Sequence, residues 1–316
     1  SASQATDEGL APAKTQRLEW ILGDYVRLLA EPEGGAAARR TGLDPVAESF
    51  QLADALRGQS VQRALASATS RAATNDPALA ALVRKEQDLR NEVTVLYRLL
   101  SNMLSAPPEQ QLPKVTADMR KRIDTLGRER KSLFADIEQR FPAYAGLINP
   151  KPASIERAKS ALRPGEALLS LLSTPARTYV WALTRDGPSV FASSALGETE
   201  IARIVAKLRG ALDPGNLPLD RYPSFDLNAA YRLYAELLKP VESGWNGAKT
   251  LLVSANGAIA QIPLALLPTE PQGTRRDKAL LFDRYREVEW LAKRVAIAQL
   301  PAVNSLVTLR ALPAGN

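Results

Sequence analysis

Two runs of apolar residues at seven-residue spacing occupy the middle of this 316-residue chain. They comprise Leu82, Leu89, Leu96 and Met103 in the first run, and Met119, Leu126 and Leu133 in the second. Heptad spacing keeps one side of a helix against a partner helix, and Pro107–Pro108 breaks the helix between the runs. The pattern predicts two long helices in an antiparallel helical hairpin, either packed on itself or acting as a docking arm for a partner.

The sequence before these runs also indicates helices. The first has an apolar stripe at helical spacing, formed by Leu18, Ile21, Leu22, Val26 and Leu29. It should end at Pro32, before a flexible Gly34–Gly35 pair. Asp44–Pro45 and Asp76–Pro77 each place a capping carboxylate before a proline suited to the first helical position, and Ser60–Asn75 reads as an alanine-rich helix. We therefore expect residues 1–161 to form a region of degenerate, repeat-like helices that includes the hairpin.

From Glu166 onward the spacing of apolar residues changes from helical to strand-like. Short apolar or β-branched runs predict strands at Ala167–Ser173, Thr178–Leu183, Ser189–Ala192, Thr250–Ser254 and Val295–Gln299. Helices are predicted at Glu198–Leu212, Asp226–Leu238 and Val303–Leu309. Strands that alternate with helices predict an α/β domain with a partly parallel sheet over residues 162–316.

Two dipeptides mark the tightest predicted turns. Asp186-Gly187 should join the second and third strands, and Asn256-Gly257 is the strongest short turn signal in the chain. After it, the apolar Ile259–Ile262 segment is expected to return as a strand, with Pro263 at an edge or a kink. The polar insert Glu270–Lys278 is predicted to be an exposed loop.

The chain contains no His and no Cys. Ser-His-Asp triads, Cys-His dyads, thiol redox centres and ordinary zinc sites therefore cannot be built from this chain alone. The phosphate-loop, dinucleotide-binding and Ser-x-x-Lys motifs are absent as well. A carboxylate pair is the remaining acid–base option, and its candidate members, which also suit surface or capping roles, are Asp24, Glu48, Glu166 and Asp186. We assign no catalytic, cofactor-binding or metal-binding residue.

The net charge of +7 does not indicate nucleic-acid binding, because the 41 basic and 34 acidic residues are interleaved. Even the densest basic stretch, Arg120–Lys131, contains Asp124 and Glu129, as expected of a solvated helix face. A run of about 18 apolar residues, which a membrane span would need, is also lacking. We expect a cytoplasmic protein, with the periplasm as the alternative, because a cysteine-free chain suits both.

Three segments of the second half together resemble segments of one known family. They are Leu162–Leu169 (LRPGEALL) followed by Thr178–Trp181, then Thr250–Pro268 (TLLVSANGAIAQIPLALLP), then Ala296–Leu309 (AIAQLPAVNSLVTL). In this order and at these distances they resemble the opening of a CHAT domain, the caspase-like domain found downstream of tetratricopeptide repeats, mostly in bacteria. Asp76–Arg90 and Phe141–Pro150 are similar to the helical region that precedes such domains.

The resemblance implies a caspase-like fold within the caspase–separase type of cysteine peptidases. Members that cut peptides use a His base and a Cys nucleophile, on strand ends beyond the segments matched here. This chain then corresponds to the helical sensing region and N-terminal half of such a peptidase, catalytically inert alone. The His and Cys would lie on a second chain of a processed precursor or in a longer protein. The alternative is a pseudo-peptidase that works as a protein–protein interaction scaffold, and both hypotheses imply a protein partner or regulatory subunit.

Within these segments the chemistry of individual residues indicates structural roles. Gly257 can adopt the positive φ of a tight turn, and Trp181 should pack between the sheet and a helix. Glu166 is expected to pair with an arginine or to face solvent. Arg163 and Arg185 flank the first two strands, where they either keep the strand ends soluble or read an acidic substrate side chain.

Overall fold

A computed structural model of the chain describes residues 20–57, 76–105, 107, 112–141, 144–145, 152–218, 221–271, 273 and 282–311. The chain divides into two compact units: Ser1–Val61 with Pro152–Asn316, the sheet unit, and Gln62–Lys151, the helix-pair unit. This division differs from the boundary expected between residues 161 and 162. The N-terminal helices belong to the sheet unit because Val26, Phe50 and Ala53 are buried in one of its cores. The helix predicted at Ser60–Asn75 lies outside the described residues.

The helix-pair unit consists mainly of α4 (Pro77–Leu104) and α5 (Pro113–Arg140). The Asp76 side chain caps α4, as predicted, by accepting hydrogen bonds from the backbone N–H groups of Ala78 and Leu79. Apolar residues from the heptad runs, among them Leu89, Leu126 and Leu133, are buried between the helices.

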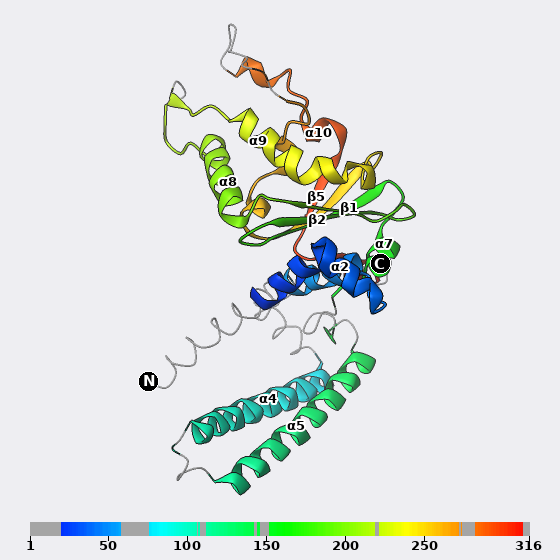
Figure 1. Cartoon of the computed structure of the whole chain (residues 1–316), viewed down its shortest axis with the longest axis vertical. Helices are drawn as coiled ribbons and strands as arrows, with labels where there is room; N and C mark the ends of the chain where they lie inside the picture. Colours follow the sequence, from blue (N-terminus) through cyan, green and yellow to red (C-terminus); the bar gives the residue numbers. More distant parts are fainter. Residues whose placement is uncertain are drawn as a thin grey trace. The chain divides into compact units, whose positions relative to one another are not determined.

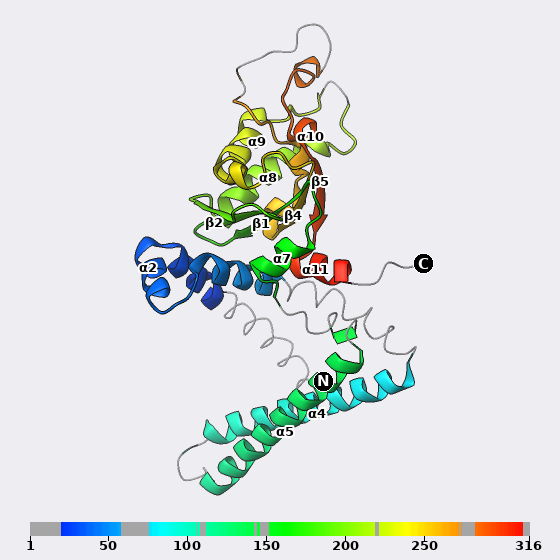
Figure 2. The ribbon, with the colours of Figure 1, turned by 90° about the vertical axis from the view of Figure 1, so that its right-hand side faces the viewer.

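Two ion pairs show how α4 and α5 run relative to each other. Arg122 pairs with Glu92, and Arg130, further along α5, pairs with Glu86, which comes earlier on α4. The two helices therefore run in opposite directions, side by side (Figures 1 and 2).

The sheet unit is built on one five-stranded mixed sheet. Its strands are β1 (Glu166–Ser173), β2 (Thr178–Thr184), β3 (Val190–Ser194), β4 (Thr250–Ala255) and β5 (Ala296–Leu300). The spatial order is β3-β2-β1-β4-β5. β1, β4 and β5 are mutually parallel, whereas β2 is antiparallel to both β1 and β3. The predicted partly parallel sheet is confirmed.

Helices cover both faces of this sheet (Figure 2). Alternate residues of β1 point to opposite faces. Leu169 and Leu171 belong to a core shared with α8 (Glu198–Leu212) and α9 (Leu227–Leu233). Leu168 and Leu172 belong to a second core, shared with the helices over residues 20–30 and 45–57, α7 (Ile155–Ala161) and α11 (Val303–Ala311). The sheet unit is thus a three-layer α/β/α arrangement.

Trp181 of β2 lies fully buried between the sheet and the N-terminal helices, as predicted. Its indole contacts the Phe50 ring edge-on, with 6.1 Å between ring centroids, and the Phe191 ring, with 5.3 Å. Aromatic pairs at such distances add stabilisation beyond the area they bury. Phe50 therefore anchors the helix over residues 45–57 to the sheet.

Other segments depart from prediction. The Gly34–Gly35 pair, expected to be flexible, lies inside the helix α2 (Pro32–Arg40). Pro32 begins this helix, because a residue in the first helical turn needs no backbone N–H for helical hydrogen bonds. The helix predicted at Asp226–Leu238 is present, but its second half is the π-helical turn η3 (Tyr234–Leu238), and the chain continues as the 3-10 helix η4 (Lys239–Gly244). The shorter remaining elements are η6 (Leu264–Leu266), η7 (Asp283–Tyr285) and α10 (Leu291–Arg294).

The segment after β4 also differs from the expected return strand. Gly257 has a φ of +61°, as predicted, but the chain continues as the 3-10 helix η5 (Gly257–Gln261). Ile259 and Ile262 are buried in the core that contains α8, so burial of these side chains accounts for the apolar pattern without strand pairing. The insert predicted at Glu270–Lys278 lies mostly outside the described residues. Among the described helices, none combines the length and the apolar character that a membrane crossing requires.

Candidate functional site

The sheet has one topological switch point, between β1 and β4. From β1 the chain proceeds outward to β2 and β3 on one side, then returns to β4 on the other side of β1. In α/β proteins, ligands bind in the crevice at the carboxyl ends of the strands that flank such a point. The carboxyl ends of β1, β4 and β5 are therefore the first place to look for a site.

A cavity of about 680 Å³ lies there, within the 300–1,000 Å³ typical of ligand pockets. We call it the switch-point cleft. Residues that end or follow the three parallel strands line one side, namely Ser173, Thr174, Ala255, Asn256, Gly257 and Pro301. The helix over residues 20–30 contributes Trp20, Asp24 and Arg27, and the helix over residues 45–57 contributes Leu56 and Arg57.

Asn256 holds the strand ends of the cleft together. Its side-chain oxygen accepts a hydrogen bond of 2.7 Å from the backbone N–H of Ser173, and its amide nitrogen donates to the Ser173 carbonyl at 2.9 Å. The amide thus replaces a backbone peptide group where the ladder between β1 and β4 ends. The next residue, Gly257, needs its positive φ to turn away from the sheet.

Arg57 brings a buried positive charge to the wall of the cleft. The side chain is 2% exposed, and its guanidinium donates to the Leu171 carbonyl at 2.8 Å and to the Ser170 hydroxyl, both on β1. Burial lowers the pKa of Arg57 to about 10, whereas the negative charge of Asp54 acts to raise it.

Asp54, one turn before Arg57, is 1% exposed. Its two carboxylate oxygens accept hydrogen bonds from the backbone N–H groups of Ala153 at 2.9 Å, Val303 at 2.7 Å and Asn304 at 3.2 Å. The last two groups lie at the start of α11, where backbone N–H groups lack helical partners. Asp54 therefore satisfies three buried donors and compensates the charge of Arg57.

Sequence reasoning missed both residues, although the chain carries the signal. Phe50, Ala53, Asp54 and Arg57 follow the i, i+3, i+4, i+7 spacing of one helix face. Two ionisable residues on the apolar face of a helix indicate a buried, hydrogen-bonded pair, because an isolated buried charge is too costly.

At the rim of the cleft, Arg27 lies between two carboxylates. It pairs with Asp24 at 3.2 Å and with Glu31 at 3.1 Å, and all three side chains are about half exposed. Glu198, at the start of α8, adds another carboxylate. The cleft therefore offers hydroxyl, amide, carboxylate and guanidinium groups for binding, and the chain has neither an imidazole nor a thiol to add to them.

The carboxylates considered from sequence are not gathered in this cleft. Asp24 lines it, but Glu166 is the first residue of β1, at the opposite end of the strand from Ser173. Glu48 lies half-buried on the helix over residues 45–57, and Asp186 is exposed after β2.

Glu166 pairs with an arginine, as expected. It binds Arg310 at 2.9 Å and accepts a hydrogen bond from the Arg163 N–H. Burial acts to raise the pKa of Glu166, but these hydrogen bonds and the positive charges outweigh it, so the net change lowers the pKa. Arg185 donates to the Leu162 carbonyl at this same end of the sheet. Arg163 and Arg185 thus flank the strand end opposite the cleft.

Within the described parts of the chain, His, Cys, Asp and Glu side chains nowhere gather in groups of three or more that could hold a metal ion. Comparisons with models of protein families and with curated proteins give no match for this chain. The resemblance to CHAT domains therefore stays a prediction that rests on the three segments themselves.

Proposed function

We propose that this chain is the partner-binding region and N-terminal part of a caspase-like cysteine peptidase of the CHAT type. On this proposal it is inert alone, because the His base and the Cys nucleophile are not on the chain. The observation that carries the proposal is the sheet order β3-β2-β1-β4-β5 with β1, β4 and β5 parallel.

This order supports the proposal because β5 is an edge strand among the strands that the structure describes. Three of its five residues, Ala296, Ala298 and Gln299, are exposed, which is unusual for a parallel strand between two layers of helices. An unpaired strand edge is a template for a further strand. A parallel strand added there would end on the same side of the sheet as Ser173 and Asn256.

That geometry would bring catalytic groups to the switch-point cleft. The resemblance implies that the His and Cys occupy the ends of strands beyond the matched segments. Carboxyl ends of adjacent parallel strands meet at one edge of a sheet, so both side chains would border the cleft. The cleft would then supply hydrogen-bonding groups to a bound peptide, and the added strands would supply the nucleophile and the base.

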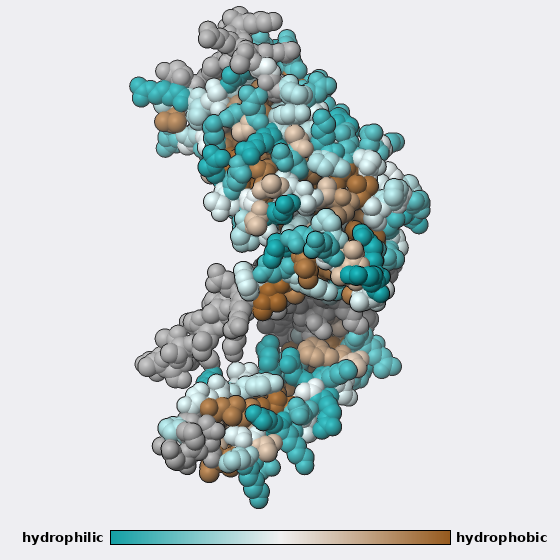
Figure 3. All heavy atoms as spheres, in the orientation of Figure 1, coloured by the Kyte–Doolittle hydropathy of each residue, from teal (hydrophilic) through white to brown (hydrophobic). Residues whose placement is uncertain are grey.

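The helix-pair unit supports the partner-binding part of the proposal. Large apolar side chains remain exposed on it, and Figure 3 shows hydrophobic side chains gathered along this unit. They are Val95, Tyr97, Leu99, Leu104, Leu112 and Val115. Val95 and Leu99 are four residues apart on α4 and therefore share one helix face. Exposed apolar side chains that share a face are typical of interaction surfaces. We call these six residues the apolar row.

The first experiment is a denaturing intact-mass measurement on the native protein, purified from its source cells by a tag at the chromosomal locus. We expect a polypeptide that contains both His and Cys, as a second chain or as a parent heavier than 34.3 kDa. This assembly should cleave peptides, and alkylation of its cysteines should abolish cleavage. A single species with the mass of this chain plus its tag would exclude catalysis by a Cys-His pair.

The apolar row also favours the second candidate, a non-catalytic interaction scaffold. Both candidates predict that Leu99→Lys weakens retention of the native partner, whereas Leu217→Lys, at an equally exposed leucine of the sheet unit, does not. Peptidase activity separates the two. A scaffold retains its partner and shows no cysteine-dependent cleavage in the native assembly.

A further inference from the structure

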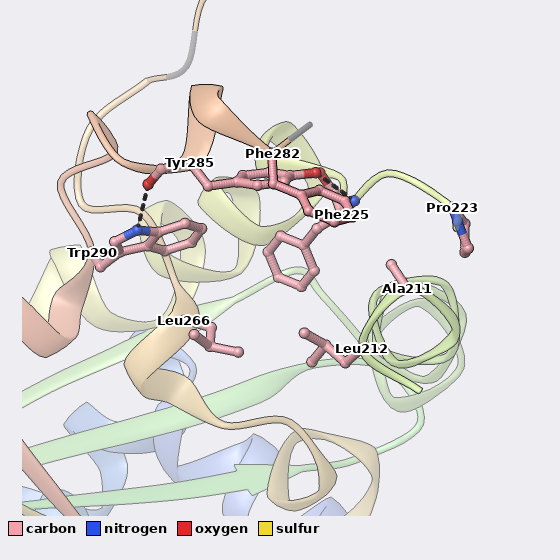
Figure 4. A pocket seen from close by; sticks show the side chains of 8 residues that line it. All are labelled: Ala211, Leu212, Pro223, Phe225, Leu266, Phe282, Tyr285 and Trp290. Atoms are coloured by element: carbon pink, nitrogen blue, oxygen red, sulfur yellow. Dashed lines mark hydrogen bonds between the residues drawn. The ribbon is translucent and has the colours of Figure 1, made fainter. Parts of the chain in front are cut away.

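A second cavity of the sheet unit, of about 230 Å³, is open to solvent and lined in part by four aromatic side chains. Figure 4 shows the rings of Phe225, Phe282, Tyr285 and Trp290 above and beside the hollow, with Leu266 and Leu212 beneath it. We call this cavity the aromatic pocket. It is separate from the switch-point cleft, because the two share no lining residue.

The rings of the aromatic pocket support one another. Phe225 and Trp290 lie 6.1 Å apart between centroids at 60°, and Tyr285 and Trp290 lie 6.4 Å apart at 40°. Phe282 stacks on Tyr285 at 6.0 Å. These tilted and stacked pairs present both faces and edges of rings, which are the surfaces that a further aromatic group prefers to contact.

The polar atoms of these rings are already used within the protein. The Tyr285 hydroxyl accepts a hydrogen bond of 2.8 Å from the Phe225 backbone N–H, and the Trp290 indole N–H donates to the Tyr285 carbonyl at 3.0 Å. A polar ligand would lose its hydration here without gaining these groups as partners. The pocket therefore favours an apolar ligand. The Arg284 guanidinium, which donates to the Tyr285 hydroxyl at 2.7 Å, also disfavours a cation.

Backbone strain at the pocket is a separate observation. Phe282 has a φ of +68°, and it is the one non-glycine residue with positive φ in the described part of the chain. A bulky residue is a genuine outlier in this conformation. Such strain persists where the surrounding structure enforces it, often at ligand sites. Here it places the Phe282 ring over the pocket.

The volume sets the size of the ligand. An apolar cavity of about 150 Å³ stays dry and binds benzene. We propose that the aromatic pocket binds one flat, uncharged aromatic group of about the size of an indole, either as a free compound or as the side chain of a peptide. This inference is independent of the proposed peptidase function.

The test uses free indole and protein labelled with 5-fluorotryptophan. The chain has four tryptophans, so the fluorine spectrum should contain one resonance each for Trp20, Trp181, Trp245 and Trp290. Trp290→Phe assigns the pocket resonance. We expect saturable movement of the Trp290 resonance on titration with indole, while the other three stay in place. Benzylammonium, which is similar in size but charged, should bind at least tenfold more weakly.

Two variants of α8 provide the matched control. Ala211→Phe places a ring at the pocket wall, whereas Ala206→Phe adds the same ring on an exposed face of the same helix. We expect the first to weaken indole binding at least tenfold and the second to leave it unchanged. Equal effects of both variants, no saturable shift up to the solubility limit of indole, or equal shifts of all four resonances would overturn the proposal.

A third arm identifies the source of the ligand. The tripeptide acetyl-Gly-Trp-Gly-amide carries the same indole on a peptide backbone. At least tenfold tighter binding of the tripeptide than of indole assigns the pocket to a peptide side chain. Equal or weaker binding assigns it to a free aromatic compound.

Discussion

The Asp54 carboxylate accepts a 2.7 Å hydrogen bond from the backbone N–H of Val303, a residue 249 positions later in the sequence. Through it, the helix over residues 45–57 caps α11, the helix that follows the last strand of the sheet. Neighbouring Arg57 binds β1 from the same helix. One turn of helix thus connects the N-terminal region to the central strand β1 and to α11, the helix that follows β5.

Asp54→Ala should be among the most destabilising single substitutions in the sheet unit. It leaves three buried backbone donors unsatisfied and removes the negative charge near buried Arg57. Each buried donor left unsatisfied costs about 1–3 kcal/mol, so the total loss should be at least about 3 kcal/mol. Urea unfolding followed by circular dichroism measures the change.

Asp44→Ala is the matched control, because Asp44 begins the same helix but is exposed. It caps the backbone N–H groups of Val46 and Ala47. An exposed cap is worth about 1 kcal/mol. Equal losses for the two variants would contradict the structural role given to Asp54.

Leu126→Ala should destabilise the helix-pair unit by about 2–5 kcal/mol, because Leu126 is fully buried and its truncation leaves a cavity. Leu99→Ala, the same substitution at a leucine that is 44% exposed, should change stability by less than about 0.5 kcal/mol. Thermal unfolding of the full chain reports both. A large loss for Leu99→Ala would show that the apolar row serves folding rather than binding.

Much of the fold follows from local sequence patterns. The bounds of α8 agree with prediction to the residue, and the five strands lie within one or two residues of theirs, because burial on both faces makes β1 and β4 continuous apolar runs. Local patterns failed where a segment's apolar residues are buried without strand pairing, as at Ile259–Ile262. They also failed to assign the N-terminal helices to the sheet unit, because that assignment depends on long-range contacts such as Phe50 with Trp181.

The candidate sites were much harder to predict. The switch-point cleft depends on strand order, which a single sequence does not specify. The aromatic pocket joins Phe225 to a segment about 60 residues later, and no periodic pattern connects such positions. Only the Asp54–Arg57 pair had a local signal, in its placement on the apolar face of a helix.

Two glycine substitutions should shift stability in opposite directions. A Cβ atom on Gly244 would lie 2.8 Å from the Ala182 Cβ and 2.9 Å from a Val190 methyl group. Gly244→Ala should therefore cost about 1–3 kcal/mol through overpacking. A Cβ atom on Gly210, in α8, would have open space around it among the described residues, so Gly210→Ala should stabilise by about 0.5–1 kcal/mol. Urea midpoints that shift in the same direction would contradict this packing.

Asp226 should give the stability of the sheet unit a dependence on acidic pH. The pKa of this carboxyl lies below its ordinary value of 3.8, although burial acts to raise it. The largest cause is the hydrogen bond from Lys207, and the second is the hydrogen bond from the Ala229 N–H. A carboxyl with a lowered pKa in the folded state stabilises the protein fully above its unfolded pKa, and that contribution disappears as pH falls through the folded value. Asp226→Asn keeps a capping oxygen but loses the charge, so it should cost about 0.5–1 kcal/mol at pH 6 and nothing once the pH is below the folded pKa. Urea unfolding of the wild-type and Asp226→Asn proteins between pH 2 and pH 6 measures the difference in their stability. In a Lys207→Met background this difference should depend less on pH. A stability difference that stays constant from pH 2 to pH 6 would show that the charge of Asp226 does not stabilise α9.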